Sequence, residues 1–261
     1  MYRLLPVLLA LGLVPLDAAV RGSTVGQERP AIMVAAAISL TDVLTAAANE
    51  YQVIGGGPVH FNFGASNMLA RQIVSGAPVD VFISADEAQM DVVAKAGLIV
   101  EGSRVDLLKN QLALVVPDDR PRTFASIREL LDPAFKRIAI GDSDAVPAGV
   151  YAKQYLEREG LWNVLLPRVV PMGSVRAALA AVESGAADAA IVYRTDASTA
   201  KRATVAWLVP PERGPRIVYP AARIRGARAG VEAAKFLDFL QSDPGTRIFE
   251  RFGFSRATQG R

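Results

Sequence analysis

Hydrophobic and polar positions along the chain follow two alternating patterns. Short apolar runs such as "IMVAAA" (32–37), "VDVFIS" (79–84) and "DAAIVY" (188–193) are typical of buried strands. The stretches between such runs have the apolar spacing of amphipathic helices. This alternation predicts an α/β protein with mainly parallel sheets flanked by helices. The predicted helices cover 39–51, 68–74, 86–96, 126–131, 149–159, 174–185, 231–240 and a last segment near 242–252.

Two strand-like segments divide the chain into two α/β halves. "NQLALVV" (110–116) and "RIVYPAARI" (216–224) are both apolar, and neither is rich in Gly or Ser as a flexible linker would be. We interpret them as two hinge strands that cross between the halves. The prediction is a lobe I formed by 29–110 plus 220–261 and a lobe II formed by 111–219.

The N-terminus has the pattern of a secretion signal. Arg3 is followed by an apolar run from Leu4 to Leu16 that Pro6 and Pro15 interrupt. The run is shorter than a bilayer span requires, so residues 1–22 are interpreted as an approximate signal peptide. An uncleaved membrane anchor is the alternative. We expect an exported, periplasmic protein.

Composition and charge exclude several classes of protein. The chain has 261 residues, of which 51% are hydrophobic and 21% charged, with a formal net charge of +3. The basic residues are scattered beside acidic ones, which argues against a nucleic-acid-binding surface. The absence of cysteine excludes disulfides and thiolate metal sites. His60, the single histidine, has no partner motif for metal binding or catalysis.

Small and hydroxyl residues recur where predicted strands lead into helices. Ser39, Ser66, "VPAG" (146–149) and "MGS" (172–174) all occupy such turns. Free N–H groups and the helix dipole attract anions at helix N-termini, and serine adds a hydroxyl donor. For any single turn, helix capping is the simpler explanation; Ser39 with Asp42 has the spacing of a capping box. Only turns that converge would form an anion site.

Five segments closely resemble the periplasmic molybdate-binding proteins of ABC importers. The similarity runs from about Ile32 to Phe254 with the motifs in the family's order. It implies a type II periplasmic-binding-protein fold of two lobes, no enzymatic activity and no cofactor. The segments are "AAAISLTDVL", "FGASNMLARQIVSGAPVDVFISAD", "GDSDAVPAGVYAKQYL", "SVRAALAAVESGAADAAIVY" and "DFLQSDPGTRIFERFGF".

The resemblance also implies a set of ligand-binding residues. Ser39 and Ser66 would each give a hydroxyl and a backbone N–H, Ala148 and Val175 a backbone N–H, and Tyr193 its phenol. These groups would contact the oxygens of molybdate or tungstate and would not coordinate the metal directly. The implied partner is the inner-membrane ABC permease of a molybdate importer, and we expect a monomer.

Three positions depart from the family's pattern. Ile38 stands where alanine is usual, Asn67 follows the second serine, and Arg194 follows Tyr193 where glycine is common. Arg194 could lie at the cleft mouth and alter ion capture, or point to solvent. An exposed loop charge is the interpretation we favour.

A site made only of N–H and O–H donors has a selectivity of its own. It satisfies a bare tetrahedral dianion, but it leaves the proton of hydrogenphosphate without an acceptor, at a cost of about 1–3 kcal/mol. Sulfate is also a bare dianion, so a sulfate- or thiosulfate-binding protein is the alternative.

Two other classes of protein are less consistent with the sequence. An enzyme on the same scaffold would lack a general base at these turns. The effector half of a transcription regulator is disfavoured by the export signal.

Overall fold

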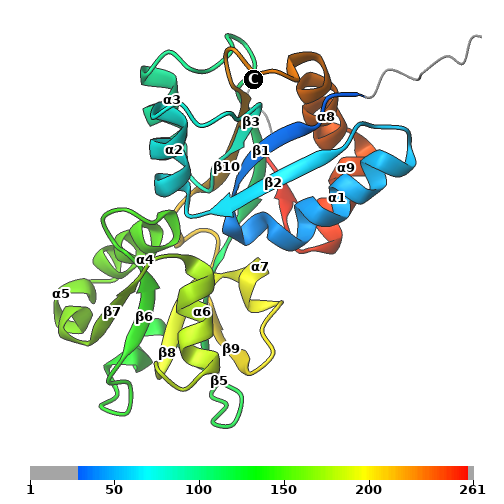
Figure 1. Cartoon of the computed structure of the whole chain (residues 1–261). Coiled ribbons are helices and arrows are strands. Elements are labelled where there is room, and N and C mark those ends of the chain that lie inside the picture. The colour runs from blue at the N-terminus through cyan, green and yellow to red at the C-terminus, as the bar shows by residue number, and fades with distance from the viewer. Residues whose placement is uncertain (1–28, 258–261) are drawn as a thin grey trace, which may run out of the picture.

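The computed structural model describes residues 29–257 and consists of two lobes, each an α/β sandwich around one sheet (Figure 1). The predicted signal segment, residues 1–22, lies outside the described residues. We call the part built on the six-stranded sheet lobe I and the part built on the five-stranded sheet lobe II. The two-lobed α/β prediction is confirmed.

Lobe I contains both ends of the described chain. Its sheet has the order β11-β4-β10-β3-β1-β2, and the C-terminal helices return to cover it beside α1, as Figure 1 shows in orange and red. The strands are β1 (Ile32–Ala37), β2 (Val59–Gly64), β3 (Val81–Ile83), β4 (Val105–Asn110), β10 (Ile217–Arg223) and β11 (Ser255–Arg256). The helices are α1 (Thr41–Val53), α2 (Ser66–Val74), α3 (Glu87–Lys95), α8 (Gly230–Gln241) and α9 (Asp243–Arg251).

Lobe II is formed by the middle of the chain. Its sheet has the order β7-β6-β8-β5-β9. The strands are β5 (Leu112–Pro117), β6 (Ile138–Gly141), β7 (Val169–Met172), β8 (Ala189–Tyr193) and β9 (Ala203–Leu208). The helices are α4 (Pro147–Arg158), α5 (Trp162–Leu165), α6 (Val175–Glu183) and α7 (Arg194–Ala197), and 3₁₀ turns span Ile127–Leu131 and Leu166–Arg168.

Both sheets are more mixed than the sequence predicted. In lobe I, β1 pairs in parallel with β2 and β3, whereas β10 runs antiparallel to β3 and β4. In lobe II, β6 pairs in parallel with β7 and β8, whereas β5 runs antiparallel to β8 and β9. The antiparallel pairs arise because strands that enter or leave a lobe run against its βα units. Each sheet thus keeps three parallel strands whose carboxyl ends share one edge.

The segment "NQLALVV" is not one hinge strand. β4 ends at Asn110 and β5 begins at Leu112, so a single residue, Gln111, separates strands of different sheets. The sequence pattern missed β4 because "VDLLKN" is charged at two positions and only its central leucines are fully buried. The second crossing runs from β9 to β10.

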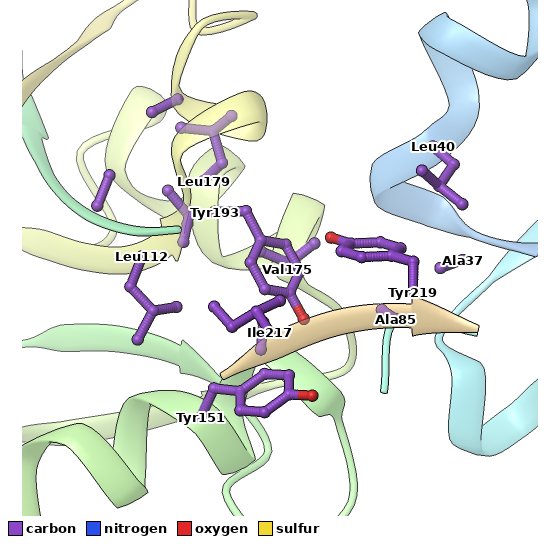
Figure 2. Close-up of a cluster of buried hydrophobic side chains, with 14 of the residues drawn as sticks. Ala37, Leu40, Ala85, Leu112, Tyr151, Val175, Leu179, Tyr193, Ile217 and Tyr219 are labelled. Carbon is purple, nitrogen blue, oxygen red and sulfur yellow. The ribbon is translucent and has the colours of Figure 1, made fainter. Parts of the chain in front are cut away.

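Buried side chains of the two lobes meet at this crossing. Leu112 and Ile217 lie next to the crossing segments, and Tyr193 of β8 lies beside Tyr219 of β10, with ring centroids 5.7 Å apart (Figure 2). All four are at most 3% exposed. The junction between the lobes is therefore packed like a core at its base.

Candidate functional site

The carboxyl ends of six strands converge on one cavity between the lobes. Ser39, Ser66 and Ala85 follow β1, β2 and β3; Ala148 and Val175 follow β6 and β7, and Tyr193 ends β8. All five residues that the sequence analysis singled out line this cavity, together with Ala85. The remaining lining residues are Ala37, Ile38, Gly64, Ala65, Val146 and Pro147.

The cavity is lined entirely by uncharged residues. It encloses about 220 Å³, its open mouth included, and its walls are small aliphatic residues, two serines and one tyrosine. Polar contact with a ligand must therefore come from hydroxyl groups and backbone amides. A site of this kind can neutralise an anion through dipoles and hydrogen bonds rather than through a paired cation.

Ser39 does not cap a helix, so the predicted capping box is wrong. It lies in the 3₁₀ turn Ile38–Leu40, and α1 begins after it at Thr41 with no side-chain cap. The Ser39 hydroxyl is instead 3.2 Å from the phenol oxygen of Tyr219. Because of this extra turn, Ser39 precedes the start of α1, and it lies in the wall of the cavity.

Ser66 is the first residue of α2, and it does not cap that helix either. The N-cap position belongs to Ala65, which has no capping side chain. The Ser66 oxygen accepts a hydrogen bond from the N–H of Ala85 at 3.0 Å. Because the oxygen is the acceptor in that bond, the Ser66 hydrogen is left to donate elsewhere.

Lobe II contributes the starts of two helices. Pro147 and Ala148 are the first two residues of α4, and Val175 is the first residue of α6. N–H groups in a first helical turn have no partner within the helix, so those of Ala148 and Val175 can serve a ligand. Among the four turns singled out from the sequence, capping is the correct explanation only at Ser174, whose oxygen accepts from the N–H of Ala177 at 3.1 Å.

The glycine of "VPAG" lets α4 start against the end of β6. A Cβ atom at Gly149 would lie 1.9 Å from the carbonyl oxygen of Gly141, and one at Gly141 would lie 2.6 Å from a Val146 methyl carbon. Only glycine permits this approach of helix to strand. The two glycines therefore set the position of Ala148 in the cavity wall.

Tyr193 carries a hydroxyl without a partner in the described chain. The residue is 1% exposed, and its phenol oxygen makes no hydrogen bond within residues 29–257. Leaving a buried hydroxyl unpaired costs about 1–3 kcal/mol. Burial raises the pKa of Tyr193 well above its ordinary value, so the group remains a protonated donor. A ligand in the cavity is the natural acceptor for it.

Arg176 links the two lobes beside the cavity. It follows Val175 in α6, and its guanidinium lies 2.6 Å from a carboxylate oxygen of Asp42 in α1 of lobe I. It also lies 2.5 Å from the fully buried carboxylate of Asp196. Burial raises the pKa of Asp196 to about 6, against the lowering effect of Arg176. The cation that follows Val175 is thus already engaged by two carboxylates.

Arg194 takes neither of the positions considered from the sequence. It is half-buried and donates a hydrogen bond to the carbonyl oxygen of Gly253, which follows α9 in lobe I. The favoured prediction of a solvent-exposed charge was wrong because α7 turns the side chain back toward the lobe junction. Arg194 is a contact between the lobes, away from the lining of the cavity.

Three residues near the cavity were missed from the sequence. Ala85 could have been found, because it follows the third parallel strand as Ser39 and Ser66 follow the first two. Tyr219 and Asn110 had no local signal. Tyr219 contacts Ser39 across 180 residues of chain, and Asn110 contacts Tyr219 across 109.

The described part of the chain offers no cluster of three or more His, Cys, Asp or Glu residues that could hold a metal ion. No helix between residues 29 and 257 has the length and apolar character needed to cross a membrane.

Comparison with known proteins identifies the family. The family described as bacterial extracellular solute-binding protein matches residues 32–255. The chain belongs to this family. The molybdate-binding protein ModA of Escherichia coli (strain K12) is 37% identical over 246 residues, which cover 92% of this chain and 94% of that protein. ModA of Haemophilus influenzae is 31% identical over 230 residues, covering 86% of this chain and 89% of that protein.

Solved structures agree with this membership of the solute-binding family. The periplasmic molybdate-binding protein of Azotobacter vinelandii matches with a TM-score of 0.79 at 26% identity, covering 87% of this chain and all of that one. The resemblance stated from the motifs is confirmed, as is the two-lobed α/β fold. These relatives are binding proteins, in agreement with the prediction that the chain is not an enzyme.

Proposed function

We propose that this solute-binding protein captures molybdate in the cavity between its lobes and delivers it to the permease of an ABC importer. One observation carries the proposal: both lobes present only uncharged groups to the same cavity, at all five positions that the family resemblance implies. The proposed contacts are the hydroxyls of Ser39, Ser66 and Tyr193 and the backbone N–H groups of Ala148 and Val175. The relatives with the highest identity given above are molybdate-binding proteins.

Hydrogen-bond donors suit a bare tetrahedral dianion. Molybdate and tungstate offer only acceptor oxygens, so each donor of the cavity can be satisfied at once. Hydrogenphosphate would bring a proton that needs an acceptor, and an unmatched proton would cost about 1–3 kcal/mol. Sulfate passes this filter, so its rejection depends on the size of the cavity.

Capture would couple to closure of the lobes. A ligand that contacts lobe I and lobe II together stabilises the form in which both are close. The Arg176–Asp42 pair and the Arg194–Gly253 hydrogen bond span the lobes and would belong to this closed form. We infer that the closed protein, a monomer in the periplasm with no cofactor, is the form that the permease receives.

Isothermal titration of the purified protein with molybdate, tungstate, sulfate and phosphate tests the function. Tight binding of the first two with weak binding of the others is the expected result. A protein that binds sulfate as tightly as molybdate would support the alternative of a sulfate- or thiosulfate-binding protein. Binding of none of the four would overturn the proposal.

Small-angle scattering tests the closure. Addition of molybdate is expected to make the protein more compact, because the ion stabilises contact between the lobes. A scattering profile unchanged by saturating molybdate would show that capture does not involve lobe movement.

A further inference from the structure

Hydroxyl groups can accept as well as donate, which bears on how the cavity selects its ion. Serine and tyrosine oxygens offer lone pairs, so a freely rotating hydroxyl could accept the proton of hydrogenphosphate. The cavity rejects protonated oxyanions by hydrogen bonding only if its hydroxyls are held in the donating orientation. The neighbours of each hydroxyl decide this.

Ser66 is held as a donor by a backbone group. The N–H of Ala85 points at the Ser66 oxygen at 3.0 Å, and an N–H cannot accept in return. The Ser66 hydrogen therefore points away from Ala85, and Ser66 lines the cavity, where a ligand oxygen can accept that hydrogen.

Ser39 is reached by a chain of bonds that begins at the hinge. Asn110 is the last residue of β4, and its side-chain oxygen accepts from the N–H of Gln111 at 2.8 Å. Because that N–H can only donate, the amide cannot be turned around. Its NH₂ group therefore faces the other way and donates to Thr195 at 2.8 Å and to the Tyr219 oxygen at 3.1 Å.

Tyr219 in turn determines which group donates in its hydrogen bond with Ser39. Its oxygen has two partners within the described residues, Asn110 and Ser39. Since Asn110 only donates to it, the single phenol hydrogen of Tyr219 has the Ser39 oxygen, 3.2 Å away, as its acceptor. Tyr219 is fully buried, and burial raises its pKa, so the phenol keeps its proton. Ser39 then accepts from Tyr219 and has its own hydrogen free for the cavity.

We propose that Asn110 and Tyr219 are positioning residues that fix Ser39 as a hydrogen-bond donor and thereby favour oxyanions that carry no proton. This inference rests on the proposed function and adds a specificity role for two residues outside the cavity lining. Tyr193 has no such neighbour within residues 29–257 and its hydroxyl can still turn, so the proposed preference comes from Ser39 and Ser66.

Competition between two ions of similar shape tests the inference. Sulfate and phosphate are allowed to displace bound molybdate at about pH 8, where phosphate is chiefly hydrogenphosphate. In the wild type, sulfate is expected to compete better than phosphate. In Tyr219→Phe the Ser39 hydroxyl can rotate and accept, so the sulfate-to-phosphate ratio of affinities should fall by about tenfold. Tyr155→Phe, which removes a buried phenol outside the cavity, should leave the ratio unchanged.

A second variant guards against a folding defect in the first. Asn110→Asp replaces the donating NH₂ group by an acceptor, so Tyr219 would donate to residue 110 and Ser39 to Tyr219. The added charge weakens both ions alike, whereas the loss of a fixed donor at Ser39 lowers their ratio. Thermal unfolding of each variant establishes that it is folded.

The outcomes separate this inference from the proposed function. A wild-type ratio above one that is kept in both variants overturns the inference and leaves the proposed function standing. A wild type that binds molybdate but prefers phosphate to sulfate overturns the inference and leaves the proposed function standing. A wild type that binds no molybdate overturns both. A ratio that falls in both variants and not in Tyr155→Phe supports the role of Asn110 and Tyr219.

Discussion

The two halves of the cavity are built from the same kind of βα unit but are prepared for a ligand in different ways. In lobe I, Ser39 and Ser66 each already have a hydrogen-bond partner, Tyr219 and the N–H of Ala85. In lobe II, Tyr193 has no partner in the described chain. Lobe I is thus organised by the protein itself, whereas the lobe II half is satisfied only when a ligand is present. Substitutions in the two halves should therefore differ in their effects on ligand affinity and on the stability of the unliganded protein.

The largest loss of stability and affinity is expected where the start of α4 packs closely against the end of β6. In Gly149→Ala the new methyl group would collide with the Gly141 carbonyl, a backbone atom that cannot rotate away. We expect a loss of about 3 kcal/mol or more in the free energy of unfolding and a loss of molybdate binding. Chemical denaturation measures the first. Gly173→Ala, where a Cβ meets nothing within 4 Å, should change stability by less than about 0.5 kcal/mol.

Ser66→Ala should lower both affinity and stability. The variant loses a donor to the ion, which should weaken molybdate binding by about 1–3 kcal/mol, and it leaves the Ala85 N–H without an acceptor. Calorimetry and thermal unfolding of the unliganded protein measure the two effects. Unchanged affinity would remove Ser66 from the site.

Tyr193→Phe should lower affinity alone. The variant removes a hydroxyl that has no partner in the described protein, so the unliganded form should be at least as stable as the wild type. Molybdate affinity should fall by about 1–2 kcal/mol, because a donor to the ion is lost. If the unliganded protein instead melted well below the wild type, the contrast between the two lobes would be contradicted.

Removing the ion pair between Arg176 and Asp42, which joins the two lobes, should have a smaller effect on molybdate binding. Asp42→Asn weakens the partly exposed pair with Arg176 and leaves the Arg176–Asp196 pair in place. We expect the ion to dissociate a few-fold faster, a change below about 1 kcal/mol, with little change in unfolding. Stopped-flow displacement of molybdate measures the rate, and added salt should reduce the difference from the wild type.

The smallest effect is expected from alkaline pH. An ordinary phenol begins to lose its proton as the pH approaches about 10. Because burial raises the pKa of Tyr193, its neutral donating form is favoured to still higher pH. Molybdate affinity should therefore stay constant between about pH 7 and pH 9. A tenfold fall over that range, measured by titration at each pH, would show that a site group ionises.

Local pattern predicted the βα units and the positions of the turns. Apolar runs marked β1, β3 and β8, and small and hydroxyl residues at four strand-to-helix turns marked where a ligand could approach. The five site residues came from the family resemblance, which places Ser39, Ser66, Ala148 and Val175 at these turns and Tyr193 at the end of a strand.

Contacts between distant segments could not be predicted. The spacing of Ser39 and Asp42 fits a capping box, but Tyr219 lies 180 residues further on and engages the serine instead. Asp42 pairs with Arg176, 134 residues away and in the other lobe. The capping box predicted from local spacing does not form, because each side chain binds a partner in a distant segment instead. Those partners depend on how the chain and its lobes pack together.

A crystal structure of the protein grown with molybdate tests the central claim most directly. The account predicts one anomalous molybdenum peak in the cavity between Ser39, Ser66, Ala148, Val175 and Tyr193, with no arginine or lysine nitrogen within hydrogen-bond distance of its oxygens. A peak held chiefly by a cationic side chain, or one located outside this cavity, would contradict it.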